Sequence, residues 1–252
     1  MTARDALRMP SVLERNATLA EMNRTGKARS ADGEPVDIIP SGIGLNCAEA
    51  LYQTVAKVKP AVAVEVGMAI GVSSLAILTA MHENGKGRLI SIDPNQSTDW
   101  KGSGCHGVRQ SGFAASHELI EKPSYIALPE LVARGARVDF AYIDGWHTFD
   151  YVLVDFFFID RLLSPGGVVA FNDCSYPSIH KVLLYLSSHR HYEQIDVGLG
   201  ATPVRESLRT RAFRLLGPGL SFQQRRMKPI LEDRYFRKLD RWEPSWSFFH
   251  EF

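Results

Sequence analysis

The sequence predicts an α/β fold in which a doubly wound, mostly parallel sheet carries helices on both faces. Several short runs are almost continuously apolar or β-branched, as strands covered on both faces must be. The segments between these runs have apolar residues at helical spacing and are followed by glycines that stop a helix. Strand and helix therefore alternate, and 252 residues are enough for one sizeable core with additions.

The expected elements follow one another along the chain. Strands are expected over 61–66, 88–93, 117–122, 138–144 and 166–173. Helices are expected over 46–58, 73–84, 126–135 and 148–163. Two further strands, over 192–198 and 201–206, are separated by a short glycine-containing turn and predict a closing antiparallel hairpin.

The chain divides into three predicted regions. Residues 1–58 are expected to form an N-terminal helical cap, and 59–206 the α/β core. Residues 207–252 form a basic, aromatic extension: from residue 201 onward there are 11 Lys and Arg against 6 Asp and Glu. We expect a helix that ends near Arg241, because Pro244 cannot continue it, followed by an irregular segment.

The aromatic residues of the extension need a surface to cover. Six of them stand within fifteen residues: Tyr235, Phe236, Trp242, Trp246, Phe248 and Phe249. So many exposed rings would form an apolar patch that monomers rarely tolerate. The extension is therefore expected to be ordered, packed on the core or in a homodimer interface. A basic stretch with aromatics can bind nucleic acid, but no RNA-binding motif accompanies this one.

Composition excludes several classes of protein. The formal net charge is +1, so no overall field attracts nucleic acid or an acidic membrane. The three cysteines, Cys47, Cys105 and Cys174, form no CxxC pair and no disulfide framework. The N-terminal segment has no apolar core typical of a signal peptide, and no stretch approaches the roughly 20 apolar residues of a membrane span. A cytoplasmic protein without a nucleic-acid or membrane partner is expected.

Acidic and amide residues gather where the predicted strands end. Glu65, Asp93 and Asp144 close three strands, and Asn172 with Asp173 closes a fourth. Ligands of open parallel sheets bind outside the carboxyl ends of the strands. A single aspartate at such a place is often only a turn residue, but a sheet without a ligand has no need for the whole set.

The turn after the first strand does not fit a dinucleotide. A phosphate-binding turn has the pattern GxGxxG, whereas this chain has Glu65, Gly67, Gly71 and Ser73 in "EVGMAIGVS". A carboxylate beside the turn implies a cationic ligand, and S-adenosylmethionine has a sulfonium, an amino group and a ribose diol but no phosphate. Glu65 can take the amino group, directly or through water, while Gly67 and Gly71 admit the methionyl chain. Ser73 can cap the helix or hold the carboxylate, and Asp93 can accept both ribose hydroxyls.

Four segments taken together carry a family resemblance. "EVGMAIGVSS", "SIDPN", "VDFAYIDGWH" and "LLSPGGVVAFND" resemble successive motifs of class I S-adenosylmethionine-dependent methyltransferases, especially the small O-methyltransferases of the catechol and caffeoyl-CoA type and their bacterial relatives. The resemblance covers residues 42–205 and leaves the extension out. It implies a seven-stranded sheet whose last strand is antiparallel. It also places adenine against the loop after the third strand, where Ser124 and Tyr125 are candidate contacts, and Asp144 beside the cofactor.

The resemblance raises the question of a metal ion. Catechol-type enzymes hold Mg²⁺ with an Asp after the fourth strand and an Asp-Asn pair after the fifth, which match Asp144, Asn172 and Asp173, with the pair inverted. Oxygen donors of this kind suit Mg²⁺. The alternative catalytic group is His147, three residues after Asp144, which could take a proton from the acceptor hydroxyl.

The function predicted is methyl transfer from S-adenosylmethionine to a small hydroxylated metabolite or sugar, with His147 and Asp144 as catalytic residues. Two alternatives stay open. A non-catalytic domain could keep the fold and act as a binding or regulatory protein. An NAD(P)-dependent oxidoreductase is the second alternative, disfavoured by the missing phosphate glycines.

Overall fold

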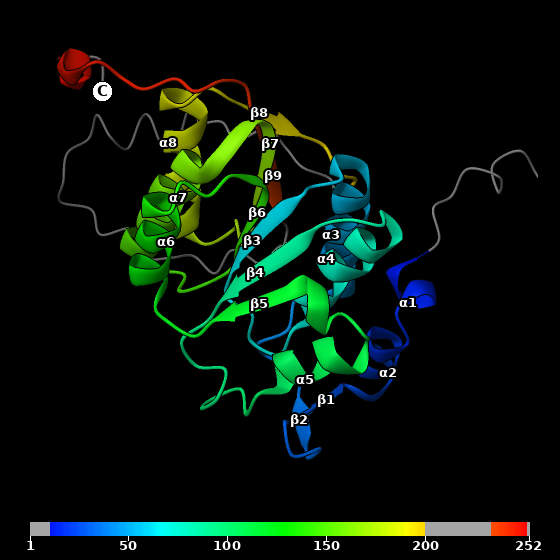
Figure 1. The fold of residues 1–252 in the computed structure, drawn as a ribbon. Coiled ribbons are helices and arrows are strands. Elements are labelled where there is room, and N and C mark those ends of the chain that lie inside the picture. The colour runs from blue at the N-terminus through cyan, green and yellow to red at the C-terminus, as the bar shows by residue number, and fades with distance from the viewer. Residues whose placement is uncertain (1–10, 200–232, 251–252) are drawn as a thin grey trace, which may run out of the picture.

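A seven-stranded sheet forms the centre of the computed structural model, which describes residues 11–199 and 233–250 (Figure 1). Its strand order is β5-β4-β3-β6-β7-β9-β8. The strands are β3 (Val62–Val66), β4 (Arg88–Ile92), β5 (His117–Ile120), β6 (Val138–Ile143), β7 (Leu163–Phe171), β8 (Tyr192–Ile195) and β9 (Arg234–Lys238). Neighbours from β5 to β7 run parallel, and β9 runs antiparallel to both β7 and β8. The predicted fold class is confirmed.

Helices cover both faces of this sheet (Figure 1). On one face lie α3 (Leu45–Val58) and α4 (Val72–Glu83), and on the other α6 (Ser124–Ala133), α7 (Phe149–Leu162) and α8 (Pro177–His189). The short helix α5 (Ser103–Gln110) and the 3-10 turn η2 (Ala114–Ser116) connect β4 to β5. All four predicted helices of the core therefore form, with ends within two residues of the expected ones.

The sheet separates two hydrophobic cores. Along β3, Ala63 belongs to the core under α3 and α4, while Val64 and Val66 belong to the core under α6, α7 and α8. Glu65 shares a face with Ala63, because successive side chains of a strand point to opposite faces. A carboxylate is thus placed inside an otherwise apolar layer beneath α4.

The N-terminal region contains more than helices. Two short helices, α1 (Val12–Arg15) and α2 (Ala17–Thr25), precede a two-stranded antiparallel hairpin of β1 (Lys27–Arg29) and β2 (Pro35–Asp37). The Asn16 side chain caps α2 by accepting from the Leu19 N–H (2.8 Å) and donates to Thr79 of α4 (2.9 Å). This pair of bonds fixes the N-terminal region against the core.

The C-terminal extension supplies a strand of the sheet. β9 lies between β7 and β8, and its Tyr235 and Phe236 are each 1% exposed, one in each core. The expected helix up to Arg241 is therefore wrong in this part. Since both faces of β9 are covered, its aromatic and apolar residues do not alternate with polar ones, and periodicity gave no strand signal. Residues 201–206, the second arm of the predicted hairpin, lie outside the described residues, and β8 pairs with β9 instead.

A buried ionic cluster holds the far end of β9. Asp160 of α7 is 2% exposed and pairs with Lys238 of β9 and with Arg190 after α8. The hydroxyl of Tyr192 in β8 also donates to Asp160 (2.6 Å). Removing one partner of such a buried group leaves a charge without compensation, which costs about 3–5 kcal/mol.

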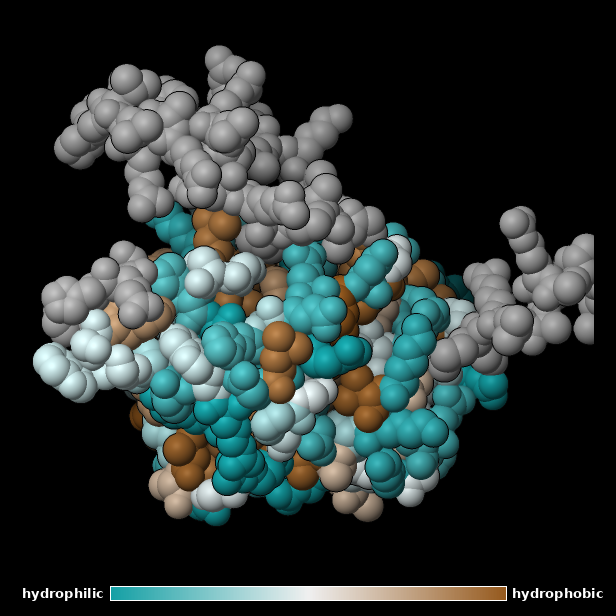
Figure 2. Space-filling model, turned by 90° about the horizontal axis from the view of Figure 1, so that it is seen from above, coloured by the Kyte–Doolittle hydropathy of each residue, from teal (hydrophilic) through white to brown (hydrophobic). Residues whose placement is uncertain are grey.

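Three further aromatics of the extension, Trp242, Phe248 and Trp246, lie beyond β9. Trp242 stacks on His191 with ring centroids 4.8 Å apart and contacts Phe248 at 5.1 Å. Trp246, at the start of the 3-10 turn η3 (Trp246–His250), is 88% exposed. Seen from above, the described surface is mainly hydrophilic, with hydrophobic residues in separate patches (Figure 2). Within the described residues, every helix is too short or too polar to cross a bilayer.

Candidate active site

Four parallel strands end at one edge of the sheet and bring the predicted site residues together. The Gly67 N–H after β3 donates to the carbonyl of Ile92 at the end of β4 (2.9 Å). The Asp144 N–H after β6 donates to Val66 (2.8 Å), and the Asn172 N–H after β7 donates to Ile143 (3.1 Å). These bonds hold the three loops that follow β3, β6 and β7 side by side.

The glycine turn after β3 is shaped by other parts of the chain. Gly67 has φ +89°, and the carbonyl of Asp144 occupies the space that a Cβ atom would fill. Gly71 also has φ +89°, and a Cβ there would lie 2.8 Å from Cα of Gly104 in α5. Both glycines are therefore required by the close passage of backbone segments, a reason that the sequence pattern alone did not indicate.

Asp93, at the end of β4, binds this turn. Its Oδ2 accepts from the N–H groups of Met68 (3.1 Å) and Ala69 (2.7 Å), and its Oδ1 accepts from Asn95 (2.8 Å). Ala69 is held at φ +44°, a left-handed conformation that is unfavourable for a residue with a side chain. A carboxylate oxygen has two lone-pair directions, so Asp93 can still accept from ligand hydroxyls.

Glu65 is fully buried and incompletely satisfied. Its Oε2 accepts from the hydroxyls of Ser74 (2.6 Å) and Ser91 (2.8 Å), whereas Oε1 has no hydrogen-bond partner. Burial raises the pKa of Glu65 to about 7, although hydrogen bonds from Ser73, Ser74 and Ser91 oppose the rise. An unpaired carboxylate oxygen beneath the glycine turn fits the predicted role of Glu65 toward a cationic group.

His147 lies between two carboxylates. Its Nε2 is 3.1 Å from Oδ1 of Asp144, and its Nδ1 is 3.5 Å from Oδ2 of Asp173. Burial disfavours the charged ring, but Asp144 and Asp173 outweigh that effect and raise the pKa of His147 above its usual value. Burial raises the pKa of Asp144 to about 7, against the influence of His147. His147 and Asp144 thus each influence the protonation of the other.

The predicted metal-binding residues are close in space but engaged with protein partners. Asp144 and Asp173 both contact the His147 ring, and the Asn172 side-chain amide donates to Asp233 (2.9 Å). Over residues 11–199 and 233–250, no three His, Cys, Asp or Glu side chains are grouped to hold a metal ion. The imidazole thus occupies the place between the carboxylates that a cation would need, and this arrangement does not fit a metal.

The predicted adenine contacts lie at the start of α6. Ser124 is buried, and Tyr125 is half exposed with its ring 6.0 Å from that of Tyr151, which is 6.4 Å from Trp146. Beneath Ser124 lies Asp155 of α7, which is buried with neither carboxylate oxygen hydrogen-bonded. Burial raises the pKa of Asp155 to about 6, opposed by the neighbouring Ser124.

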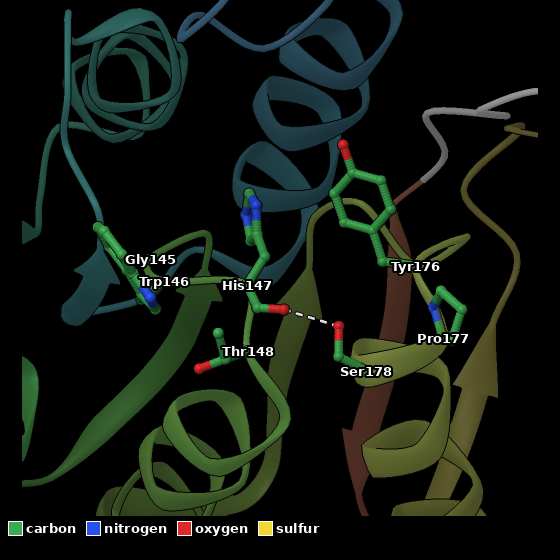
Figure 3. A pocket seen from close by; sticks show the side chains of 7 residues that line it. All are labelled: Gly145, Trp146, His147, Thr148, Tyr176, Pro177 and Ser178. Atoms are coloured by element: carbon green, nitrogen blue, oxygen red, sulfur yellow. Dashed lines mark hydrogen bonds between the residues drawn. The ribbon is translucent and has the colours of Figure 1, made fainter. Parts of the chain in front are cut away.

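A pocket of about 640 Å³ opens beside His147 (Figure 3). The loops after β6 and β7 form it, and its lining is Gly145, Trp146, His147, Thr148, Tyr176, Pro177 and Ser178. The rings of His147 and Tyr176 are 5.7 Å apart, and the Ser178 hydroxyl donates to the backbone carbonyl of His147 (2.6 Å). Among the lining residues that the structure describes, His147 is the one imidazole, and none is Lys, Arg, Asp or Glu.

Several residues of this site were missed from the sequence. Trp146 stands inside the "DGWH" segment and could have been found there as a neighbour of His147. Tyr176 and Ser178 follow the Asn172–Asp173 pair in a segment with no distinctive pattern. Asp233 is 61 residues beyond Asn172, and nothing near it in the sequence relates it to the strand ends.

Comparisons with known proteins agree with this arrangement. Residues 64–174 match a family model described as a methyltransferase domain. The O-methyltransferase TomG from Streptomyces achromogenes, solved with S-adenosylmethionine, is 17% identical and has a TM-score of 0.55; 76% of this chain and 85% of that chain are covered. An O-methyltransferase from Bacillus cereus, solved with S-adenosylhomocysteine, is 12% identical with a TM-score of 0.57, covering 75% and 84%. No curated protein is significantly similar to the chain in sequence.

The matched residues include the glycine turn, Asp93, His147 and the Asn172–Asp173 pair, and they contain β3 to β7 with the helices between them. The two solved enzymes share the fold over three quarters of this chain. The predicted methyltransferase resemblance is confirmed: residues 64–174 match the methyltransferase family model, and the chain shares the fold of the two solved O-methyltransferases.

Proposed function

We propose that this protein transfers a methyl group from S-adenosylmethionine to a hydroxyl oxygen of a small, uncharged acceptor. The observation that carries the proposal is the position of His147, which lies in the pocket and is oriented by Asp144 at the end of β6. The family match and the ligands of the two solved neighbours support the same chemistry.

The cofactor would lie across the ends of β3 and β4. We assign its amino group to Glu65, whose Oε1 has no partner, and its ribose to Asp93. The turn from Gly67 to Gly71 and the Ser73 hydroxyl would hold the methionyl part. Ser124, Tyr125 and Asp144 are assigned to its adenine side. When bound, S-adenosylmethionine supplies an electrophilic methyl group.

His147 would act on the acceptor. Its Nε2 is within hydrogen-bond distance of Asp144, whereas the 3.5 Å from Nδ1 to Asp173 is longer than a good hydrogen bond. We therefore expect Nε2–H to donate to Asp144 and Nδ1 to take the acceptor's hydroxyl proton. This geometry corresponds to a general base oriented by a carboxylate. The oxygen then becomes the nucleophile, and no step uses a metal.

The acceptor is expected to be a phenol, a catechol or a sugar. Trp146 and Tyr176 provide flat apolar surfaces in the pocket, and among residues 11–199 and 233–250 no Lys or Arg contributes to its lining. Aromatic rings bind planar rings by stacking and also contact the apolar faces of sugars. Of the lining residues that the structure describes, only His147 could offer a side-chain cation to an acidic acceptor.

Calorimetry followed by an assay tests the proposal. The wild-type protein is titrated with S-adenosylmethionine, S-adenosylhomocysteine and NAD, and then incubated with radiolabelled S-adenosylmethionine and a panel of catechols, phenols and sugars. We expect both sulfur ligands to bind and NAD not to bind, with label in one acceptor class. Binding without transfer to any acceptor would favour a non-catalytic domain. Binding of NAD alone would favour an oxidoreductase.

We also propose that the protein is a cytoplasmic homodimer. None of the three cysteines, all within the described residues, forms a disulfide, as expected in a reducing compartment. Tyr235 and Phe236 are buried in the chain's own sheet, so they give no support to a dimer, whereas Trp246 presents a large apolar side chain that is 88% exposed. Light scattering at several concentrations tests the oligomeric state.

A further inference from the structure

One buried carboxylate of the C-terminal extension lies directly behind the strand ends that carry the candidate active site. Asp233 precedes β9 and is 0% exposed. In the antiparallel pairing of β7 with β9, Phe171 faces Arg234, so the next residue pair along is Asn172 and Asp233. The sheet register thus places Asp233 beside the loop that contains Asn172 and Asp173.

Three side chains from three strands donate to this carboxylate. The Asn172 amide donates to Oδ1 (2.9 Å), while the hydroxyls of Tyr142 and Tyr235 donate to Oδ2 (3.3 Å each). The thiol of Cys47 in α3 adds a further hydrogen bond. Asp233 therefore joins β6, β7, β9 and α3 at one point.

These bonds reach the neighbours of His147 on both sides. Tyr142 is two residues before Asp144 on β6, and Asn172 immediately precedes Asp173. Because a carboxylate can only accept, the amide nitrogen of Asn172 must face Asp233. Asp173 has φ +51°, an unfavourable conformation that persists only when surrounding contacts enforce it.

We propose that Asp233 is a positioning residue of the active site, which fixes Asn172 and Tyr142 and thereby sets the orientation of the two carboxylates that hold His147. This inference rests on the proposed methyl transfer by His147. It assigns a site role to the C-terminal extension, which lies outside the matched methyltransferase domain at 64–174. The place of β9 beside β7 is what brings Asp233 next to Asn172.

The test compares two buried carboxylates that hold opposite ends of β9. Asp233→Asn keeps the shape but replaces an acceptor oxygen by an amide group, and Asp233→Ala removes the group. Asp160→Asn is the matched control, because it loosens the Lys238 end of the same strand without contact to the site residues. For each variant, NMR records the ring proton shifts of His147, calorimetry records S-adenosylhomocysteine affinity, and the wild-type acceptor assay records kcat.

We expect the Asp233 variants to shift the His147 ring signals and to lower kcat at least tenfold, while affinity for S-adenosylhomocysteine stays within about threefold. Asp160→Asn should lower thermal stability and leave the His147 signals at wild-type positions. Unchanged His147 signals in a folded Asp233→Asn protein would overturn the inference, as would equal shifts in Asp160→Asn. A wild-type protein that does not bind S-adenosylhomocysteine would instead overturn the proposed function, and the NMR comparison would still decide the role of Asp233.

Discussion

The carbonyl oxygen of Asp144 occupies the space that a side chain on Gly67 would fill. The glycine turn after β3 and the loop after β6 are thereby packed backbone to backbone. Asp144 also contacts Nε2 of His147. The glycine turn assigned to the cofactor and the candidate base therefore both contact Asp144. A change at Gly67 should consequently affect both binding and catalysis.

Gly67→Ala is expected to displace the loop after β6 and to lower affinity for S-adenosylhomocysteine more than tenfold. Gly85→Ala is the matched control, since Gly85 has a similar positive φ of +66° and no atom near its Cβ position. The control carries only the backbone penalty, about 1 kcal/mol. Thermal melting and calorimetry compare the two variants. Equal losses in both would show that the close approach to Asp144 has no consequence.

Asp93→Ala should weaken both ligand binding and folding. Besides its assigned role toward the ribose, Asp93 accepts three backbone N–H groups around the turn. Losing charge-assisted bonds of this kind costs about 3 kcal/mol of unfolding free energy. Asp139→Ala is the control at the opposite end of β3, because Asp139 accepts from the N–H groups of Ala61 and Val62.

The Asp139 variant should lose stability and keep its affinity for S-adenosylhomocysteine, whereas the Asp93 variant should lose both. Urea unfolding and calorimetry give the two quantities. An Asp93→Ala protein with wild-type affinity would remove the ribose assignment.

Glu65→Gln is expected to change how stability depends on pH. The folded-state pKa of Glu65 is about 7 and its usual value is 4.5, so the folded protein binds the extra proton between these values. The contribution of Glu65 to the unfolding free energy of the wild-type protein should therefore decrease as pH rises from 4.5 to 7. By pH 8 this loss of unfolding free energy should amount to about 3 kcal/mol.

The variant lacks this contribution, so its unfolding free energy should rise relative to wild type over that pH range and then stay constant. Urea unfolding of both proteins at several pH values measures the difference. A difference that is independent of pH would show that the Glu65 carboxylate is already ionised in the folded protein at pH 5.

The parallel part of the fold could be predicted because each strand and helix carries its own pattern. The runs around Val62–Val66 and Val138–Ile143 are apolar on both faces, and the strand ends could be placed at one edge by the rule for parallel sheets. β9 could not be predicted, since its place between β7 and β8 depends on pairing with distant residues.

The candidate site, like the fold, could be predicted only in part. Glu65, Asp93, Asp144 and His147 stand next to strand ends, so their proximity followed from topology. The hydrogen bonds of the site could not be predicted in this way. They depend on side-chain packing between segments far apart in sequence, which places Asn172 against Asp233 and His147 between Asp144 and Asp173. The metal prediction relied on residue types alone, and it stays a prediction, because the contacts of those residues with His147 and Asp233 come from side-chain packing.

Truncation after Glu232 removes Asp233 and β9, and it should abolish soluble expression. β9 fills the gap between β7 and β8, and its loss exposes Phe171 and Tyr192, which pack beside Phe236 and Phe156. Truncation after Arg241 is the control, because it removes Trp242 and the residues beyond while β9 remains. Expression tests and light scattering compare the two. A soluble, folded protein that ends at Glu232 would contradict this view of the sheet.

His147→Gln is expected to lower kcat by about 10²–10⁴-fold while affinity for S-adenosylhomocysteine stays near that of wild type. The base must be neutral, and the pKa of His147 is raised above 6.5 by Asp144 and Asp173 in spite of burial. Wild-type kcat should thus fall as pH drops through that raised value and level off above it.

Because the imidazole fills the place between the carboxylates, activity should also survive EDTA. A pH-rate profile for the wild type, repeated with EDTA and with added Mg²⁺, tests both statements on one protein. Abolition of activity by EDTA and its recovery with Mg²⁺ would make Asp144 and Asp173 metal ligands and would remove His147 as the base.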